Sequence, residues 1–170
     1  HGFLTPQLVI VSNEGELRLL GFEASSGLRE AANHPLIKQS AGRYLAPEVL
    51  AGAPPAKSDD VYSLGAILFE LLTGRALPVS TAGGQAALVD QAVIAADGGN
   101  LHPELANLLK RSLVPREQRI GDAVTWHKTL AKMMFEGQYN PTTFNLAFFM
   151  HNLFREEIER ETQELELEKT

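Results

Sequence analysis

The histidine side chains are the first candidates for metal chemistry, and their spacing does not suggest a site. No two of them have the three intervening residues that place a pair of ligands on one face of a helix, and the chain has no cysteine to supply thiolates. The sequence therefore predicts no metal site and no disulfide. The five histidines are His1, His34, His102, His127 and His151.

Phosphate binding is the second possibility, and the glycines do not favour it. A phosphate-binding loop places glycines before a helix so that backbone N–H groups can surround the phosphate, as in G-x-G-x-x-G. The chain has neither this pattern nor a Walker loop, and we interpret Gly83-Gly84 and Gly98-Gly99 as loop breaks. No strand-like segment carries a V-A-I-K-like lysine.

The composition predicts one globular domain with a local excess of negative charge. The 170 residues are 44% hydrophobic and 21% charged, which is enough to bury a sizeable core. Of the formal net charge of −6, residues 155–170 contribute −4, from seven Glu against two Arg and one Lys. This balance argues against nucleic-acid binding. No apolar run reaches the roughly 20 residues that span a bilayer, and residues 1–15 lack the pattern of a signal peptide, so we expect a cytoplasmic domain.

A small β-hairpin is predicted at the N-terminal end. Leu8–Val11 is rich in β-branched residues, Ser12–Gly15 has turn residues, and residues 16–20 alternate between polar and apolar side chains. Ala24–Gln39 contains the Asn33-His34-Pro35 breaker and has no sustained period. We expect it to be a surface loop, with at most a helical turn at Leu28–Ala32.

The rest of the chain is predicted to be helical. Ser58 is the expected cap of a helix that continues with apolar residues at helical spacing until Gly74 and Pro78. Because this helix is apolar on most sides, we expect it to be central and buried. The fold class is therefore mainly α, with the hairpin at its start. Further helices are predicted over Gln85–Ala96, over Pro103–Leu113, from Asp122 to near Gly137, and from Thr142 or Thr143 onward.

Two stretches around the predicted central helix form a specific motif. Tyr44–Leu50 contains Ala-Pro-Glu, and Lys57–Gly74 follows with an Asp, a Tyr-Ser-x-Gly and a long apolar run. Pro115–Arg119 adds a later proline and arginine. This combination resembles the C-terminal lobe of protein kinases, from the A-P-E motif into the central buried helix. The resemblance covers about residues 1–135, which we predict to be a kinase-like C-terminal lobe, and residues 136–170 are predicted to be a C-terminal helical extension.

The resemblance implies structural roles for several residues. In kinases the Glu of A-P-E forms a largely buried ion pair with the late arginine, which here implies a pair between Glu48 and Arg119. Asp60 is implied to accept backbone N–H groups from the catalytic-loop region. His1 takes the first position of that loop, and Phe22 takes the position of the packing phenylalanine in D-F-G.

The same resemblance implies that the catalytic groups are missing. Aligned on H-R-D-L-x-x-x-N, Phe3 replaces the catalytic Asp, Thr5 replaces a lysine that neutralises the transferred phosphate, and Leu8 replaces the metal-binding Asn. Gly21 replaces the Asp of D-F-G. Phosphoryl transfer needs an orienting carboxylate and metal ligands. We expect Glu23, two residues later, to point elsewhere, so no catalytic, cofactor-binding or metal residue is predicted. ATP and Mg²⁺ are expected only if an upstream lobe supplies the site.

The C-terminal extension is predicted to be one helix from Phe144 to Thr170, apolar on two faces in its first half and acidic after it. Two interpretations remain open at this point. The helix docks on its own lobe and frays into a solvated tail, or it allows self-association through residues 142–168.

The predicted function is that of a pseudokinase: a catalytically inactive kinase-like domain that acts as a scaffold or regulatory protein-interaction module in signalling. One alternative is a part of an unorthodox serine/threonine protein kinase whose ATP-binding lobe lies upstream. Another is an oligomerisation module that uses the C-terminal helix. A protein partner is expected, whereas nucleic acid and membrane are not.

Overall fold

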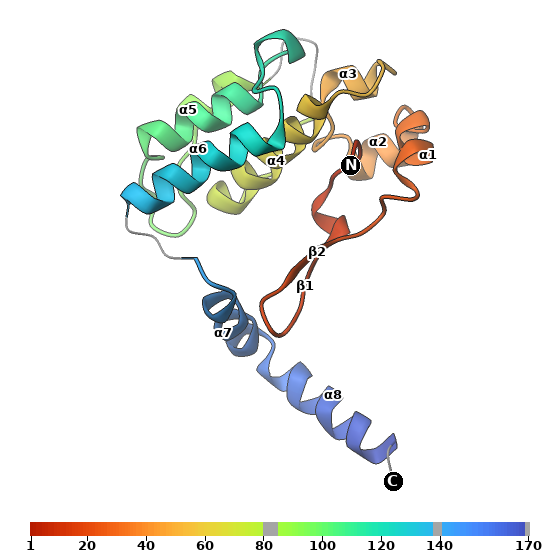
Figure 1. Ribbon diagram of the computed structural model, residues 1–170, viewed down its shortest axis with the longest axis vertical. Helices are drawn as coiled ribbons and strands as arrows, with labels where there is room; N and C mark the ends of the chain where they lie inside the picture. Colours follow the sequence, from red (N-terminus) through yellow and green to blue (C-terminus); the bar gives the residue numbers. More distant parts are fainter. Residues whose placement is uncertain (80–84, 138–140, 169–170) are drawn as a thin grey trace. The chain divides into compact units, whose positions relative to one another are not determined.

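The computed structural model describes residues 1–79, 85–137 and 141–168 (Figure 1). The predicted loop break at Gly83-Gly84 and the last two residues of the predicted long helix lie outside these ranges. The chain divides into two compact units. The first unit comprises His1–Leu8 and Gly21–Gln138, and the second comprises Val9–Leu20 and Tyr139–Thr170. We describe each unit separately.

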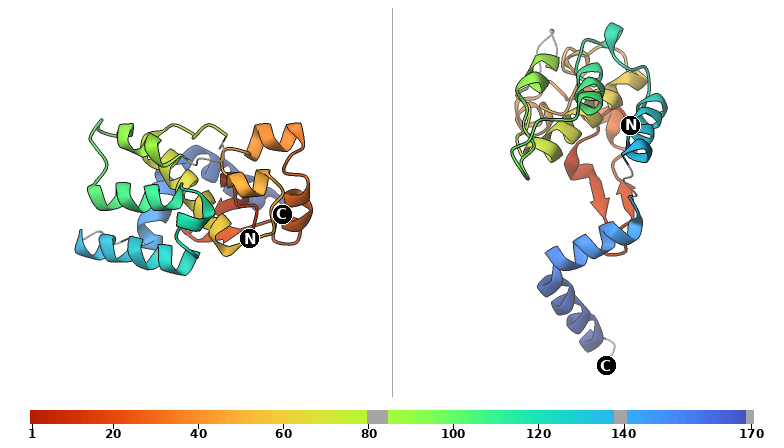
Figure 2. Two further views of the ribbon diagram at one scale, coloured as in Figure 1. Left: turned by 90° about the horizontal axis from the view of Figure 1, so that it is seen from above. Right: turned by 90° about the vertical axis from the view of Figure 1, so that its left-hand side faces the viewer.

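The first unit is helical and is organised around α4, Lys57–Thr73. Helices α5, Pro103–Ser112, and α6, Ala123–Glu136, lie alongside α4 (Figures 1 and 2). The short helices α1, Ser25–Glu30, α2, Pro35–Ala41, and α3, Pro47–Leu50, precede it. Three 3-10 helices complete the unit: η1, Pro6–Leu8, η2, Ala86–Gln91, and η3, Arg116–Gln118.

Helix α4 is the buried centre that the sequence predicts. Tyr62 and Val61 are fully buried. Tyr62 shares the larger hydrophobic cluster with Leu109 of α5, and Val61 shares a second cluster with Leu108 of α5. Gly65 allows close packing of the two helices, because a β-carbon added there would lie 2.6 Å from Cβ of Ser112 in α5. The mainly α class and the position of this helix are therefore confirmed.

The start of α4 differs from the prediction that Ser58 caps it. The N-cap residue is Ala56, and Ser58 lies inside the helix and is buried. The Asp59 carboxylate accepts the N–H of Ala56 at 3.0 Å and so satisfies a backbone group at the helix start. At the other end, Gly74 adopts φ +66°, a left-handed conformation that glycine takes without steric cost.

Two further predictions about segments of the first unit are wrong. Ala24–Gln39 is not a loop, because α1 forms there and Pro35 begins α2 at its first turn instead of breaking the chain. Gln85–Ala96 is not an α-helix, because only η2 is helical and the chain is extended after it. The N–H of Ala95 donates to the carbonyl of Leu72 at 2.8 Å, which holds this segment against α4.

The predictions for α5 and α6 are confirmed. Pro103 stands at the start of α5, as its pattern indicates. Asp122 caps α6, since its carboxylate accepts the N–H of Thr125 at 2.7 Å, and the helix ends at Glu136 before Gly137.

The second unit contains the predicted hairpin and two helices. Strand β1, Val9–Val11, pairs antiparallel with β2, Leu17–Leu19, with Val9 opposite Leu19. The turn reaches α7, Thr143–Leu153, at Gly15, where φ is +78° and an added β-carbon would lie 2.0 Å from the carbonyl oxygen of Thr143. Only glycine fits this close approach, so Gly15 joins the hairpin to α7.

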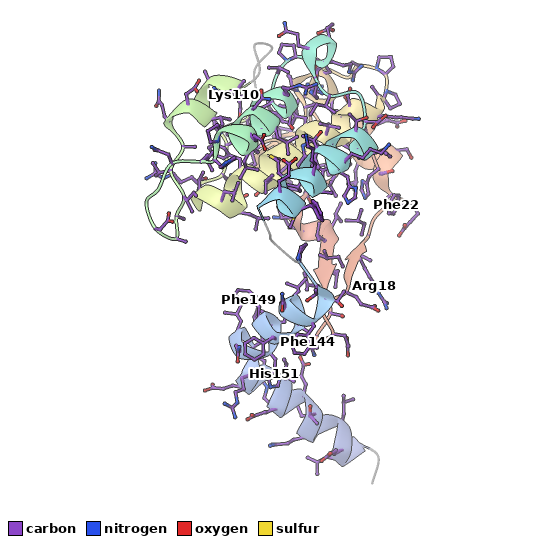
Figure 3. The ribbon with its side chains drawn as sticks, turned by 60° about the vertical axis from the view of Figure 1, so that its left-hand side comes forward. Arg18, Phe22, Lys110, Phe144, Phe149 and His151 are labelled. Atoms are coloured by element: carbon purple, nitrogen blue, oxygen red, sulfur yellow. The ribbon has the colours of Figure 1, made fainter. Side chains whose placement is uncertain are left out.

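The predicted long C-terminal helix is interrupted. Thr142 caps α7 through the N–H of Asn145, but Phe154 leaves the helical conformation at φ −116° and ψ 30°. A separate helix, α8, Arg155–Glu168, follows. The break falls where the side chains change from apolar to acidic. Figure 3 shows Phe144 and Phe149 on α7, which are 74% and 60% exposed.

Within the described part of the chain, no helix has the length and hydrophobicity required to cross a membrane.

Candidate functional site

The first residues of the chain, which the resemblance aligns with a catalytic loop, are packed into the core. Phe3 is 5% exposed and belongs to the main hydrophobic cluster, and Leu4 and Thr5 are also buried. A phenyl ring has no atom that can accept a proton from a substrate hydroxyl. At position 3, therefore, the side chain contributes packing.

Leu8 and Gly21, which the resemblance aligns with two metal-binding positions, lie against each other. A β-carbon added at Gly21 would lie 3.2 and 3.4 Å from the two terminal carbons of the Leu8 side chain. Gly21 has φ +84°, a conformation that side-chain-bearing residues rarely adopt. The structure thus brings these two positions together and leaves only hydrocarbon between them.

The nearby positions supply no metal-binding cluster either. Phe22 packs against the imidazole of His1, with ring centroids 4.6 Å apart, although Phe22 itself is 57% exposed. Glu23 is exposed. Among the described residues, no group of three or more histidine, cysteine, aspartate or glutamate side chains is arranged to hold a metal ion.

Asp60 fixes the beginning of the chain to α4. One carboxylate oxygen accepts the N–H of Gly2 at 2.7 Å, and the other lies 2.7 Å from the backbone nitrogen of His1. This is the contact that the resemblance implies for Asp60. Because both oxygens are used, the contact sets the position of the segment that carries Phe3.

Glu48 and Arg119 form the ion pair that the resemblance implies. The Nη2 atom of Arg119 lies 2.9 and 3.1 Å from the two carboxylate oxygens of Glu48, and the Arg119 side chain is fully buried. The same guanidinium donates to the carbonyls of Val114 and Ser58 and lies over the ring of Tyr62 at 5.1 Å. The buried charge therefore has several partners, which offset the cost of removing it from water.

The pKa of Glu48 reflects this environment. Burial acts to raise it, but hydrogen bonds from Arg119 and from the backbone N–H groups of Glu48 and Arg116, together with the charge of Arg119, outweigh burial. The pKa of Glu48 consequently lies below its ordinary value of 4.5.

Asp59 is a central residue that the sequence reasoning did not identify. Its side chain is 2% exposed and lies 3.0 Å from Nη2 of Arg29 and 2.8 Å from Nη2 of Arg116. Arg29 also donates to the carbonyls of Gly2 and Ala53. One signal was present: adjacent residues on a helix point about 100° apart, so Asp59 and Asp60 are expected to face different parts of the fold. The arginines that reach Asp59 could not be inferred from that signal.

We call Glu48, Asp59, Arg29, Arg116 and Arg119 the ionic cluster. Its members come from α1, α3, the start of α4 and the segment around η3. Asp59 joins Arg29 to Arg116, and the backbone N–H of Arg116 donates to Glu48 at 2.8 Å. These contacts connect elements that are up to 90 residues apart in the sequence, from Arg29 to Arg119.

Comparisons with known proteins find similarity to curated protein kinases. No protein-family model matches the chain. Over 159 residues, or 88% of the chain, it is 26% identical to Mitogen-activated protein kinase kinase 2 of Arabidopsis thaliana. Over 76 residues, or 44% of the chain, it is 36% identical to the probable serine/threonine-protein kinase PknB of Lactococcus lactis. It is also 37% identical over 78 residues to Cyclin-dependent kinase-like 5 of Homo sapiens.

The chain is protein-kinase-like. Its helical fold with a small N-terminal hairpin is that of a kinase C-terminal lobe. This kinase-like chain spans 42% of the plant relative, 12% of the Lactococcus relative and 8% of the human one. The predicted domain boundary after residue 135 stays a prediction.

Proposed function

We propose that this kinase-like chain does not transfer phosphate and acts by binding other proteins, as a pseudokinase does. The observation that carries the proposal is the contact between Leu8 and Gly21. Mg²⁺ prefers oxygen ligands in a nearly ideal octahedron. An isobutyl group against a glycine offers no side-chain oxygen at the two positions where the resemblance places metal ligands.

The surroundings of Phe3 support the same proposal. A catalytic carboxylate must reach a substrate hydroxyl, whereas Phe3 is buried in the hydrophobic core and held there by the Asp60 contacts to the preceding residues. A carboxylate at this position would replace a side chain of the hydrophobic core, and burying a charge among apolar side chains is costly.

The ionic cluster supports the binding part of the proposal. It fixes α1, α3 and α4 relative to the segment around η3 without using any group that phosphoryl transfer requires. Elements that are fixed relative to one another in this way lose less conformational freedom when a partner binds to them.

A phosphotransfer assay with Mg²⁺-ATP and casein on the intact protein tests the proposal. We expect no transfer above a blank without protein. Glu23 is the carboxylate nearest in sequence to the missing D-F-G aspartate, and Glu14, in the exposed hairpin turn, is its matched control. Transfer that Glu23→Gln abolishes and Glu14→Gln leaves unchanged would overturn the proposal.

Self-association is a second candidate function, favoured by one observation. Phe144, Phe148 and Phe149 of α7 are each at least 60% exposed, and single-chain proteins rarely expose several phenylalanines together. Light scattering on the intact chain and on Phe148→Glu checks it. A mass above that of one chain, reduced to one chain by the substitution, is the expected result, and a monomeric mass for both proteins excludes this function.

A further inference from the structure

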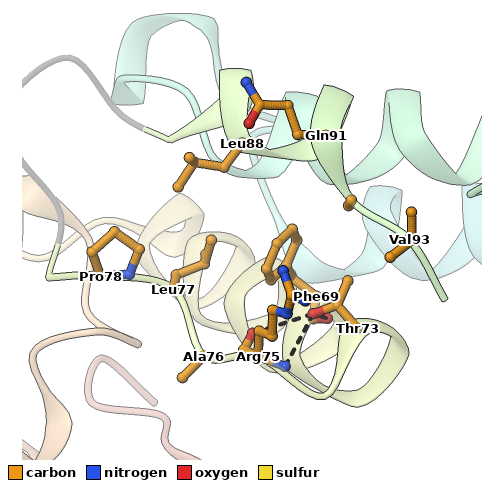
Figure 4. A pocket seen from close by; sticks show the side chains of 10 residues that line it. Phe69, Thr73, Arg75, Ala76, Leu77, Pro78, Leu88, Gln91 and Val93 are labelled. Carbon is orange, nitrogen blue, oxygen red and sulfur yellow. Dashed lines mark hydrogen bonds between the residues drawn. The ribbon is translucent and has the colours of Figure 1, made fainter. Parts of the chain in front are cut away.

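A small apolar pocket lies at the C-terminal end of α4, away from the positions aligned with catalysis. Figure 4 shows Phe69 of α4 near the centre of the pocket, with Leu77 and Leu88 to its left and Val93 to its right. The cavity volume is about 230 Å³. Phe69 and Leu77 are buried, whereas Leu88 and Val93 are 38% and 41% exposed. The pocket therefore has an apolar floor and a rim open to solvent, which carries the apolar Leu88 and Val93 and the polar Arg75 and Gln91.

Hydrogen bonds fix the residues around this pocket, both just after α4 and on either side of η2. The side-chain amide of Gln85 donates to the carbonyl of Pro78 at 2.6 Å. The Thr73 hydroxyl donates to the carbonyl of Arg75 and accepts its N–H, both at 3.2 Å. On the other side, the Ala95 N–H donates to the carbonyl of Leu72. Because these bonds do not depend on a ligand, the pocket is formed in the free chain.

The size of the pocket decides what it can hold. Sites for drug-sized ligands and cofactors have volumes of roughly 300–1,000 Å³. A pocket of about 230 Å³ is below this range but has room for one large apolar side chain. Buried single side chains of this kind contribute most of the affinity in many protein interfaces.

The charge at the pocket indicates which kind of residue the partner should carry beside its inserted apolar side chain. Arg75 lines the pocket and is exposed, and among the described residues its guanidinium forms no ion pair. The acidic residue of η2, Asp90, does not line the pocket and is paired with Lys110 of α5. Arg75 is the only charged residue among the described residues that line the pocket, so the charge there is positive.

We propose that this pocket binds a short segment of a partner protein that inserts one large apolar side chain and pairs an adjacent acidic residue with Arg75. The inference rests on the proposed binding function and assigns it a site and a class of partner. The apolar anchor supplies affinity, and the acidic neighbour supplies orientation and selectivity.

An oriented peptide array tests this with the intact chain, fluorescently labelled, as the probe. Four pools of nine-residue peptides are randomised except at a central pair, which is Phe-Glu, Phe-Lys, Ala-Glu or Ala-Lys. We expect saturable binding to the Phe-Glu pool, about tenfold weaker binding when Ala replaces Phe, and about threefold weaker binding when Lys replaces Glu.

Two variants locate the binding. Arg75→Glu should reverse the preference so that the Phe-Lys pool binds better than Phe-Glu, whereas Lys128→Glu, on the exposed surface of α6, should leave it unchanged. Ala92→Phe places a ring in the pocket and should abolish binding. Arg75→Glu alters only an exposed side chain and should not affect folding. It therefore still tests whether the peptides bind at this pocket if Ala92→Phe does not fold.

Two results overturn the inference: no saturable binding to any pool, or binding that neither Arg75→Glu nor Ala92→Phe alters. Either result leaves the proposed absence of phosphotransfer intact, because that is measured separately with Mg²⁺-ATP. Conversely, phosphotransfer that depends on Glu23 overturns the proposed function even if the peptides bind.

Discussion

Two regions of the first unit, the ionic cluster and the positions aligned with catalysis, differ in what fills them. In the ionic cluster, Glu48 and Asp59 each have guanidinium nitrogens within 3.1 Å. At the other positions, Phe3 packs in the core and Leu8 packs on Gly21. Asp60 shares a feature with each region: it is charged, like the cluster, and it contacts the backbone of His1 and Gly2, next to Phe3.

The difference is that the ion pairs of the cluster involve none of the positions aligned with catalysis. A buried ion pair cannot lose one partner without leaving an uncompensated charge, so each member of the cluster depends on the others. A side chain that only performs chemistry has no such dependence. Hydrocarbon can occupy its place, and at Phe3 it adds to the core.

The largest expected effect comes from breaking the ionic cluster at Arg119. Arg119→Ala leaves Glu48 without its guanidinium and removes the donors to Val114 and Ser58. We expect the free energy of unfolding to fall by about 3–5 kcal/mol. Urea titration followed by the fluorescence of Trp126, the single tryptophan and a buried one, measures it.

Lys110→Ala is the matched control for that measurement. Lys110 pairs with Asp90 in the same unit, but their side chains are 38% and 63% exposed. Surface pairs contribute roughly 0–1 kcal/mol. Equal losses in the two variants would show that burial of Arg119 does not set the strength of the cluster.

The sequence was most informative where local pattern and packing agree. The apolar spacing of α4, the Asp122 cap of α6 and the turn at Gly15 were all readable from residue order. The pair of Glu48 and Arg119 followed from the resemblance, because that motif specifies partners distant in sequence.

What could not be predicted depends on tertiary contacts. The Arg29 contact to Asp59 requires α1, which forms in a segment without helical periodicity. The chain becomes extended at Ala92 after η2, and the N–H of Ala95 donates to the carbonyl of Leu72 in α4 instead of to a carbonyl of its own segment. The contact between Leu8 and Gly21 joins residues that the hairpin separates in sequence.

An intermediate effect is expected at the second region, from Gly21→Ala. The change imposes φ +84° on a residue with a side chain and brings its β-carbon to 3.2 Å from Leu8. Gly52→Ala is the control, because Gly52 has φ +75° but no atom within 4 Å of an added β-carbon. We expect a loss of about 1 kcal/mol at Gly52 and up to about 2 kcal/mol at Gly21. Identical losses from urea titration would mean that the Leu8 contact is not tight.

The ionic cluster is also expected to show a pH dependence. The pKa of Glu48 is lower in the folded chain than its ordinary value of 4.5. The ionised carboxylate therefore stabilises the fold fully above that value, and this contribution is lost as the pH falls below it through the folded pKa.

Glu48→Gln isolates this contribution, because glutamine has no charge to lose. At pH 7 the variant should be less stable than the natural chain, and the difference in free energy of unfolding should shrink in urea titrations at pH 5, 4 and 3. Asp122, whose pKa is also lowered, through hydrogen bonds from Thr125, titrates in both proteins and cancels in the difference. A difference that stays constant from pH 7 to 3 would mean that the guanidinium of Arg119 stabilises Glu48 equally in its neutral form. The ionic cluster would then not depend on charge, and the contrast with the positions aligned with catalysis would be lost.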